Sequence, residues 1–192
     1  MKNLNTYITE KFQVSKDNIR KYKYYPKDKD ELIECIKEKL EEEGLGTEDN
    51  PLDLNDIDTS KITDMSYLFD TDYEKLSKLS LDGYFDISDW NVSNVENMRY
   101  MFSHSGFNGD ISDWDVSKVN NMGHMFEYSE FNSDISNWNV SKVNDMGYMF
   151  TDSAFTGKNG DISNWNVGNV ENMYGMFTNC PLEKNPPKWY KE

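Results

Sequence analysis

The chain has 192 residues, of which 20 are lysine or arginine and 35 are aspartate or glutamate, so its formal net charge at pH 7 is −15. Residues 1–50 carry ten basic and twelve acidic residues. Residues 51–192 carry ten basic and twenty-three acidic residues, so most of the negative charge lies there. Such a field repels nucleic acid and anionic membranes, and it attracts basic partners at low salt. We therefore expect neither direct nucleic-acid binding nor membrane binding, and like charge favours a monomer.

The start of the chain bears on its location. Residues 1–16 contain no apolar run of the ~7–15 residues that a signal peptide requires. Nor does any segment approach the ~18 apolar residues of a membrane span. We expect a cytoplasmic protein for the sequence as given, and a surface or secreted protein only if a leader was removed. Cys35 and Cys180 are expected to be free thiols.

Residues 1–50 are not repetitive, and their spacing predicts two helices. Residues 4–12 place apolar side chains at helical intervals. The segment Asp30–Glu43 does the same, and Gly44 is expected to end the second helix. We predict that both helices form an N-terminal cap over the first repeat, because that repeat would otherwise expose its apolar face. A separate ligand-binding domain is the alternative.

A block of about 24 residues repeats along the rest of the chain. The sequence DISDWNVSNVENMRYMF is followed by DISDWDVSKVNNMGHMF, DISNWNVSKVNDMGYMF and DISNWNVGNVENMYGMF. A degenerate copy without the tryptophan begins at Leu52, and residues 70–84 form an insert before the first full copy. A fixed period of this length is typical of a solenoid, in which each unit packs only against its neighbours.

The pattern within one repeat predicts a strand and a helix. Ile111, flanked by polar residues, indicates a strand of two or three residues, and Ser117–Phe126 places its apolar residues on one helical stripe. The predicted fold class is α/β. We expect a right-handed solenoid of about five leucine-rich-repeat-like coils, each with a short parallel strand and a short helix, in residues 51–180. An α-helical N-terminal cap (1–50) precedes it and a C-terminal cap (181–192) follows.

The unit F-N-x-D-I-S-x-W-N-V-S-x-V-x-x-M-x-x-M-F resembles the BspA-like leucine-rich repeat of bacterial surface proteins, including Mycoplasma surface lipoproteins. The resemblance covers roughly residues 52–180, and its V-x-x-M-x-x-M-F core recurs intact four times. It implies surface adhesion and protein binding, with no defined catalytic residues. No phosphate-binding loop, dinucleotide fingerprint, zinc spacing or nucleophile elbow is present either, so we expect no enzyme activity and no cofactor.

Equivalent positions of successive repeats form columns, and these columns carry the candidate sites. The tryptophan, methionine and phenylalanine columns are expected to fill the core. An acidic column allows three interpretations: its carboxylates accept hydrogen bonds from turn N–H groups, bridge calcium ions, or contact a partner. Its members are Asp53, Asp86, Asp110, Asp134 and Asp161.

A fourth column lies between the two methionines of each repeat, off the apolar stripe. Its place predicts partial exposure, and tyrosine is common at protein interfaces. The alternative is that these rings only shield the methionine row. The members are Tyr67, Tyr100, His124 and Tyr148.

The first functional hypothesis is a non-enzymatic repeat scaffold that binds another protein with a basic surface. It would use the acidic column, the tyrosine column and the insert. The second is an acidic inhibitor from a mobile element that imitates nucleic acid, which competition with DNA or RNA would reveal. The third is a bacterial surface adhesin or glycan binder, for which a glycan array is the test.

Overall fold

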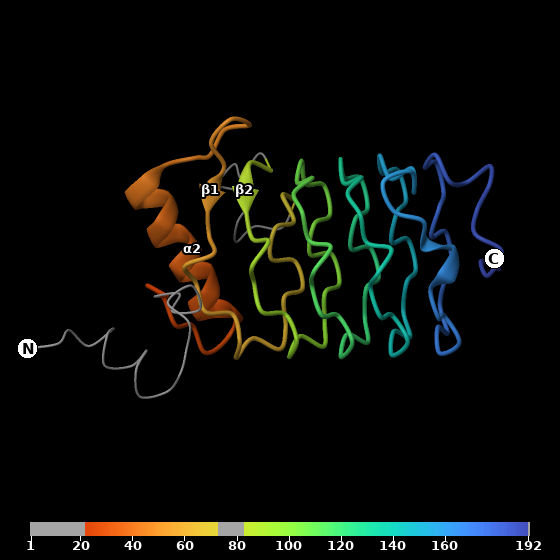
Figure 1. The fold of residues 1–192 in the computed structure, drawn as a ribbon, viewed down its shortest axis with the longest axis horizontal. Coiled ribbons are helices and arrows are strands. Elements are labelled where there is room, and N and C mark those ends of the chain that lie inside the picture. Colours follow the sequence, from red (N-terminus) through yellow and green to blue (C-terminus); the bar gives the residue numbers. More distant parts are fainter. Residues whose placement is uncertain (1–21, 73–82, 192) are drawn as a thin grey trace, which may run out of the picture.

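The computed structural model describes residues 22–72 and 83–191. Their elements are helix α2 (Lys29–Glu43), strands β1 (Leu52–Asp53) and β2 (Phe85–Asp86), and the 3-10 helix η3 (Ile162–Asn164). The two strands pair in parallel, and the repeats follow one another from α2 toward the C-terminus (Figure 1). None of the described helices is long and apolar enough to cross a membrane.

The predicted fold class is wrong. No repeat in the described residues contains an α-helix, and β1 and β2, two residues each, form the single described sheet. A solenoid of strand-plus-helix, leucine-rich-repeat-like coils is therefore not what these residues form. The predicted helical cap is not formed either: the first predicted helix lies outside the described residues, and the second is the single helix α2. The domain boundaries stay a prediction.

Turns connected by hydrogen bonds between repeats replace the predicted helices. The backbone N–H groups of Met98, Tyr100 and Phe102 donate to carbonyls of the next repeat, at 2.9–3.1 Å. The N–H groups of Met101 and Ser103 instead donate to the carbonyl three residues earlier. Along this segment, N–H groups that donate to carbonyls of the next repeat alternate with N–H groups that donate to carbonyls of the local turn. The backbone N–H groups therefore find hydrogen-bond acceptors without a helix. Isolated parallel bridges connect the repeats at Asp64, Asn97, Asn121, Asp145 and Asn172.

The expected core columns are confirmed except at Met173, which is only half-buried. Trp90, Trp114, Trp138 and Trp165 are buried, as are the phenylalanines that follow the second methionine of each repeat. Each indole N–H donates to a carbonyl of the preceding repeat; the Trp138 bond to Ile111 is 3.1 Å long. The Trp165 indole bonds to a carbonyl 30 residues earlier, whereas the Trp138 indole bonds to one 27 residues earlier. The Trp165 bond is nevertheless of similar length, 3.2 Å. The longer turn TGKNG therefore leaves the core register unchanged.

Helix α2 begins at Lys29, one residue before the predicted start, and ends at Glu43 as predicted. The Asp28 side chain accepts a hydrogen bond from the Glu31 N–H, which satisfies a free donor of the first turn. Gly44, at a φ of 78°, donates its N–H to the Leu40 carbonyl. Leu32 and Ile36 are fully buried in the same core as the repeats, so the apolar face of α2 is covered.

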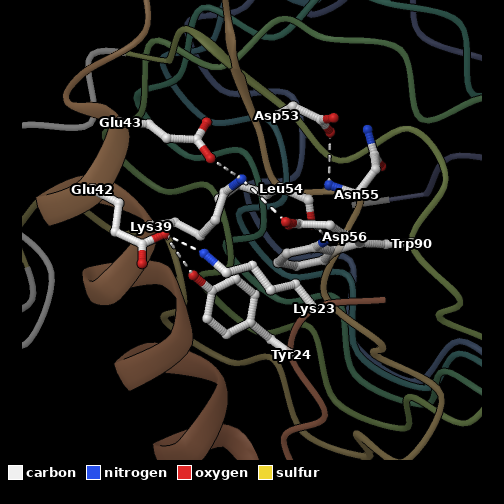
Figure 2. Close-up of polar contacts among 10 residues, drawn as sticks. All are labelled: Lys23, Tyr24, Lys39, Glu42, Glu43, Asp53, Leu54, Asn55, Asp56 and Trp90. Atoms are coloured by element: carbon white, nitrogen blue, oxygen red, sulfur yellow. Dashed lines mark hydrogen bonds and ion pairs between the residues drawn. The ribbon is translucent and has the colours of Figure 1, made fainter. Parts of the chain in front are cut away.

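An ion-pair cluster around the buried Lys39 connects α2 to the first repeat-like segment (Figure 2). Lys39 is only 3% exposed, and its Nζ lies 2.6 Å from Glu43 and 3.3 Å from Asp56. Burial by itself lowers the pKa of Lys39, but the hydrogen bonds to these two carboxylates raise it above its ordinary value. Lys39 is therefore charged at neutral pH, and Glu43 and Asp56 supply the compensating charge.

We expect Lys39→Met to lower the free energy of unfolding by about 1–3 kcal/mol, because it removes the cation beside Glu43 and the partly buried Asp56. Urea unfolding at pH 7 measures the loss. The matched control is Lys37→Met, which removes an exposed pair with Glu34 and should cost less than about 0.5 kcal/mol. Equal effects of the two changes would show that the cluster is no more stabilising than a surface pair.

We also expect Trp138→Phe to cost about 1–2 kcal/mol, from a lost buried hydrogen bond and lost ring volume. Trp189→Phe is the control, because the same indole bond to Ile162 is only part-buried there and water can replace it. Thermal melting of the two variants under identical conditions compares them. A larger loss at Trp189 would contradict the importance of the buried bond.

Candidate functional site: the aromatic rows and the acidic column

The left-handed backbone of each repeat positions two outward rows of side chains. Tyr100, at a φ of 57°, and His104, at 54°, adopt a conformation that costs a non-glycine residue roughly 1–2 kcal/mol. The equivalent residues four positions apart in the following repeats do the same. Because the conformation recurs at the same two positions, the side chains of successive repeats align in two rows.

The first aromatic row is the predicted tyrosine column. Its residues are half-buried, which confirms the expected partial exposure. The ring centroids lie 4.7, 4.2 and 4.8 Å apart, and neighbouring planes are within 17° of parallel. The row is therefore a continuous stack of rings. Its members are Tyr67, Tyr100, His124 and Tyr148.

Stacking decides which parts of these rings a partner can reach. Tyr67 and His124 cover the two faces of Tyr100, and Tyr100 and Tyr148 cover the two faces of His124. The guanidinium carbon of Arg99 also lies over the Tyr100 ring, 4.9 Å from its centre. Burial raises the pKa of Tyr100, and the positive charge of Arg99 opposes this. The central rings thus offer edges and polar atoms, and not their faces.

A second aromatic row, which the sequence analysis missed, lies four residues further along each repeat. It consists of His104 and Tyr128, whose ring centroids are 4.7 Å apart. Tyr128 is 52% exposed. In the next repeat the row continues with Asp152, and the negative charge and hydrogen bond of that carboxylate raise the pKa of Tyr128. Comparing repeats position by position would have found this row, because the residues follow the first row at a constant interval.

Carboxylates lie beside both rows. Nδ1 of His124 is 2.8 Å from Oε2 of Glu127, and since a carboxylate only accepts, His124 carries a proton on Nδ1. Nε2 of His104 lies 3.5 Å from Oδ2 of Asp72. The aromatic rows together with Asp72, Glu127 and Asp152 are named the aromatic face. This combination of ring edges, hydroxyls and carboxylates is suited to cationic side chains.

The acidic column is used by the turns. Asp86, Asp110, Asp134 and Asp161 each accept a hydrogen bond at Oδ1 from the N–H two residues later, at 2.8–2.9 Å. These bonds lower the pKa of Asp134 and Asp161. Within the described residues, no three His, Cys, Asp or Glu side chains gather as a metal site would need. The turn interpretation is therefore confirmed, and contact with a partner stays a prediction.

A groove of about 720 Å³ lies at the N-terminal end of this column. Asp86, Asp110, Tyr84 and Glu130 are among its lining residues, and Phe107 contributes apolar surface. Of the predicted insert 70–84, residues 73–82 lie outside the described residues. Of its described residues, Asp72 belongs to the aromatic face and Tyr84 lines the groove.

Comparison with known protein families identifies one family that these repeats match. Residues 46–128 and 73–189 match the family described as "Mycoplasma protein of unknown function, DUF285". The chain belongs to this family. Comparison with curated proteins gives no match, and neither does comparison with solved structures. The matched residues include the acidic column and both aromatic rows.

We expect Asp134→Asn to keep the turn, because an amide oxygen also accepts the Ser136 N–H, as Asn139 does for Ser141. Asp134→Ala should lose about 1 kcal/mol. A carboxylate whose folded pKa is depressed stabilises the fold above pH ~4, and this contribution is lost as the pH falls through the folded pKa. Urea unfolding at pH 7 and at pH 3 should therefore show a smaller acid-induced loss for Asp134→Asn than for wild type. Identical acid sensitivity would contradict the assignment.

Proposed function

We propose that this DUF285 protein is a non-enzymatic repeat scaffold that binds another protein, and that the partner presents a basic surface. The observation that carries the proposal is the aromatic face: two stacked rows of partly exposed rings bordered by Asp72, Glu127 and Asp152. Tyrosine is enriched in protein interfaces because it offers a large apolar area and a hydroxyl at a low entropic cost. The rows are therefore a suitable contact surface.

Charge supports a basic partner. The chain carries a net charge of −15, most of it in residues 51–192. Its field accelerates the approach of a cationic protein and weakens as salt is added. Lysine and arginine side chains of the partner would then donate hydrogen bonds to the carboxylates and to the tyrosine hydroxyls. The acidic column would contribute to the field, although its Oδ1 atoms are engaged by turns.

The finer relationship, to BspA-like repeats, belongs to the same proposal, and the F-N-x-D-I-S-x-W unit supports it. It suggests a surface adhesin as the second candidate function. Binding of sugars by stacking needs an open ring face. The covered faces of Tyr100 and His124 do not provide one, whereas the half-exposed Tyr128 is the candidate for such a contact. This makes a protein partner the favoured proposal.

The test uses the full chain as bait in native lysate, with captured proteins identified by mass spectrometry. Tyr100→Phe with Tyr148→Phe keeps the stack and removes two hydroxyls, and Glu127→Gln with Asp152→Asn removes two charges. Each pair should weaken binding of the main captured protein about tenfold, which corresponds to ~1.4 kcal/mol. Affinity should also fall as salt rises from 50 to 300 mM.

A matched control separates local contact from the general field. Asp113→Asn with Glu183→Gln removes the same charge from exposed positions outside the aromatic face and should change affinity less than twofold. If the control pair weakens binding as much as the Glu127 and Asp152 pair, the aromatic face is not the contact surface. Unchanged binding in both tyrosine and carboxylate variants would have the same meaning.

A further inference from the structure

The groove beside strand β2 is hollow because glycines line it. Its volume is about 720 Å³, and its walls come from β2 and from the next corner of the chain. A Cβ atom on Gly83 would lie only 2.2 Å from the carbonyl carbon of Gly106, and one on Gly109 would lie 2.7 Å from the Phe107 ring. The next repeat has Glu130 at the position equivalent to Gly106. The hollow therefore depends on small residues that the next repeat does not retain.

The groove offers a rigid apolar base and an open aromatic ring. The rings of Phe85 and Phe107 are at most 3% exposed and stack with their centroids 4.8 Å apart. Tyr84, in contrast, is 44% exposed. Among the described residues no aromatic ring stacks on Tyr84, whereas neighbouring rings cover Tyr100 on both faces. The Tyr84 ring is therefore available for contact with a flat group of a ligand.

The charged residues of the groove are all acidic. No lysine, arginine or histidine is among the described residues that line it. The Oδ1 atoms of Asp86 and Asp110 each accept hydrogen bonds from the N–H and the hydroxyl of the serine two residues later, at 2.9 and 2.7 Å. These bonds fix the orientation of both carboxylates before any ligand arrives, and a concave site concentrates their negative potential. The four acidic residues are Glu48, Asp86, Asp110 and Glu130.

We infer that this groove binds an arginine side chain of another polypeptide. The guanidinium group is flat and cationic, so it stacks on an open tyrosine ring and donates paired hydrogen bonds to carboxylates. Its aliphatic stem covers apolar surface such as that of Phe107. The four carboxylates complement its charge. None of these residues belongs to the aromatic face, so the inference goes beyond the proposed function and can fail separately from it.

Two other occupants fit the groove less well. Lysine is also cationic, but its compact, strongly hydrated ammonium group cannot lie flat on a ring or bind two carboxylate oxygens side by side. A sugar would stack on Tyr84, but it is uncharged and brings no compensating charge to carboxylates that lose water on binding. The combination of an open ring with several carboxylates therefore favours arginine.

Backbone amide NMR spectra of the full chain, titrated with the peptide acetyl-Gly-Gly-Arg-Gly-Gly-amide, measure this binding. A matched peptide carries citrulline, which has the shape of arginine without its charge, and a third carries lysine. The arginine peptide should bind about tenfold more tightly than the citrulline peptide and about threefold more tightly than the lysine peptide. Its largest shifts should be at the N–H groups of Gly83, Gly106 and Gly109. Equal affinity for the arginine and citrulline peptides, or for the arginine and lysine peptides, overturns the inference.

Variants of the groove test the same contact. Asp110→Asn with Glu130→Gln removes two charges, and the amide oxygen at position 110 can still accept the Ser112 N–H, so the turn is kept. This pair should weaken binding of the arginine peptide about fivefold. Tyr84→Ala should weaken it about threefold, because the stacking surface is lost. Unchanged affinity in both variants overturns the inference.

Two control pairs separate the groove from the rest of the surface. Asp134→Asn with Asp161→Asn removes the same charge from the acidic column outside the groove and should change affinity less than twofold. Glu127→Gln with Asp152→Asn, on the aromatic face, should also leave the affinity for the arginine peptide unchanged. A loss in the first control pair equal to that of the groove variant would show that only the general field attracts the peptide. A loss confined to the second pair would overturn the inference and assign the contact to the aromatic face.

Discussion

Backbone N–H groups at alternate positions donate to the next repeat, and the groups between them close local turns. This alternation requires left-handed residues such as Tyr100 and His104, which are spaced four residues apart. The left-handed conformation at these two positions therefore serves the hydrogen bonding of the fold and also directs the aromatic side chains to its surface. The conformational cost at these residues is offset by ring stacking along each row and by hydrogen bonds that leave few buried donors unsatisfied.

Burial was predictable from the sequence, whereas local conformation was not. Ile111, Trp114 and Met122 recur at constant positions, and each is buried as expected. The helix predicted over Ser117–Phe126 is wrong because apolar residues at i, i+3, i+6 and i+7 also fit a chain of turns that faces one core. Ser117, at the start of that segment, donates its N–H group to the Asp115 side chain and so closes a turn. Tyrosine in a left-handed conformation was also not expected, because few residues other than glycine adopt it.

For the candidate site, the exposure of the side chains was predictable from the sequence, but their arrangement was not. The spacing of Tyr67, Tyr100, His124 and Tyr148 predicted a partly exposed column, and the structure confirms that exposure. Ring stacking was not predictable, because it depends on the separation of successive repeats. Stacking changes the chemistry of the column, since covered faces direct recognition to edges, hydroxyls and the neighbouring carboxylates. The role of these groups in binding rests on the proposal.

The turn TGKNG adds three residues between two repeats, and the indole bond across it keeps its usual length. Changes in chain length at this corner are thus absorbed locally, without propagating into the core. A protein built in this way can acquire insertions at its corners and exchange whole repeats by recombination while its interior stays the same. Changes at the surface and changes in the core are then separable during evolution.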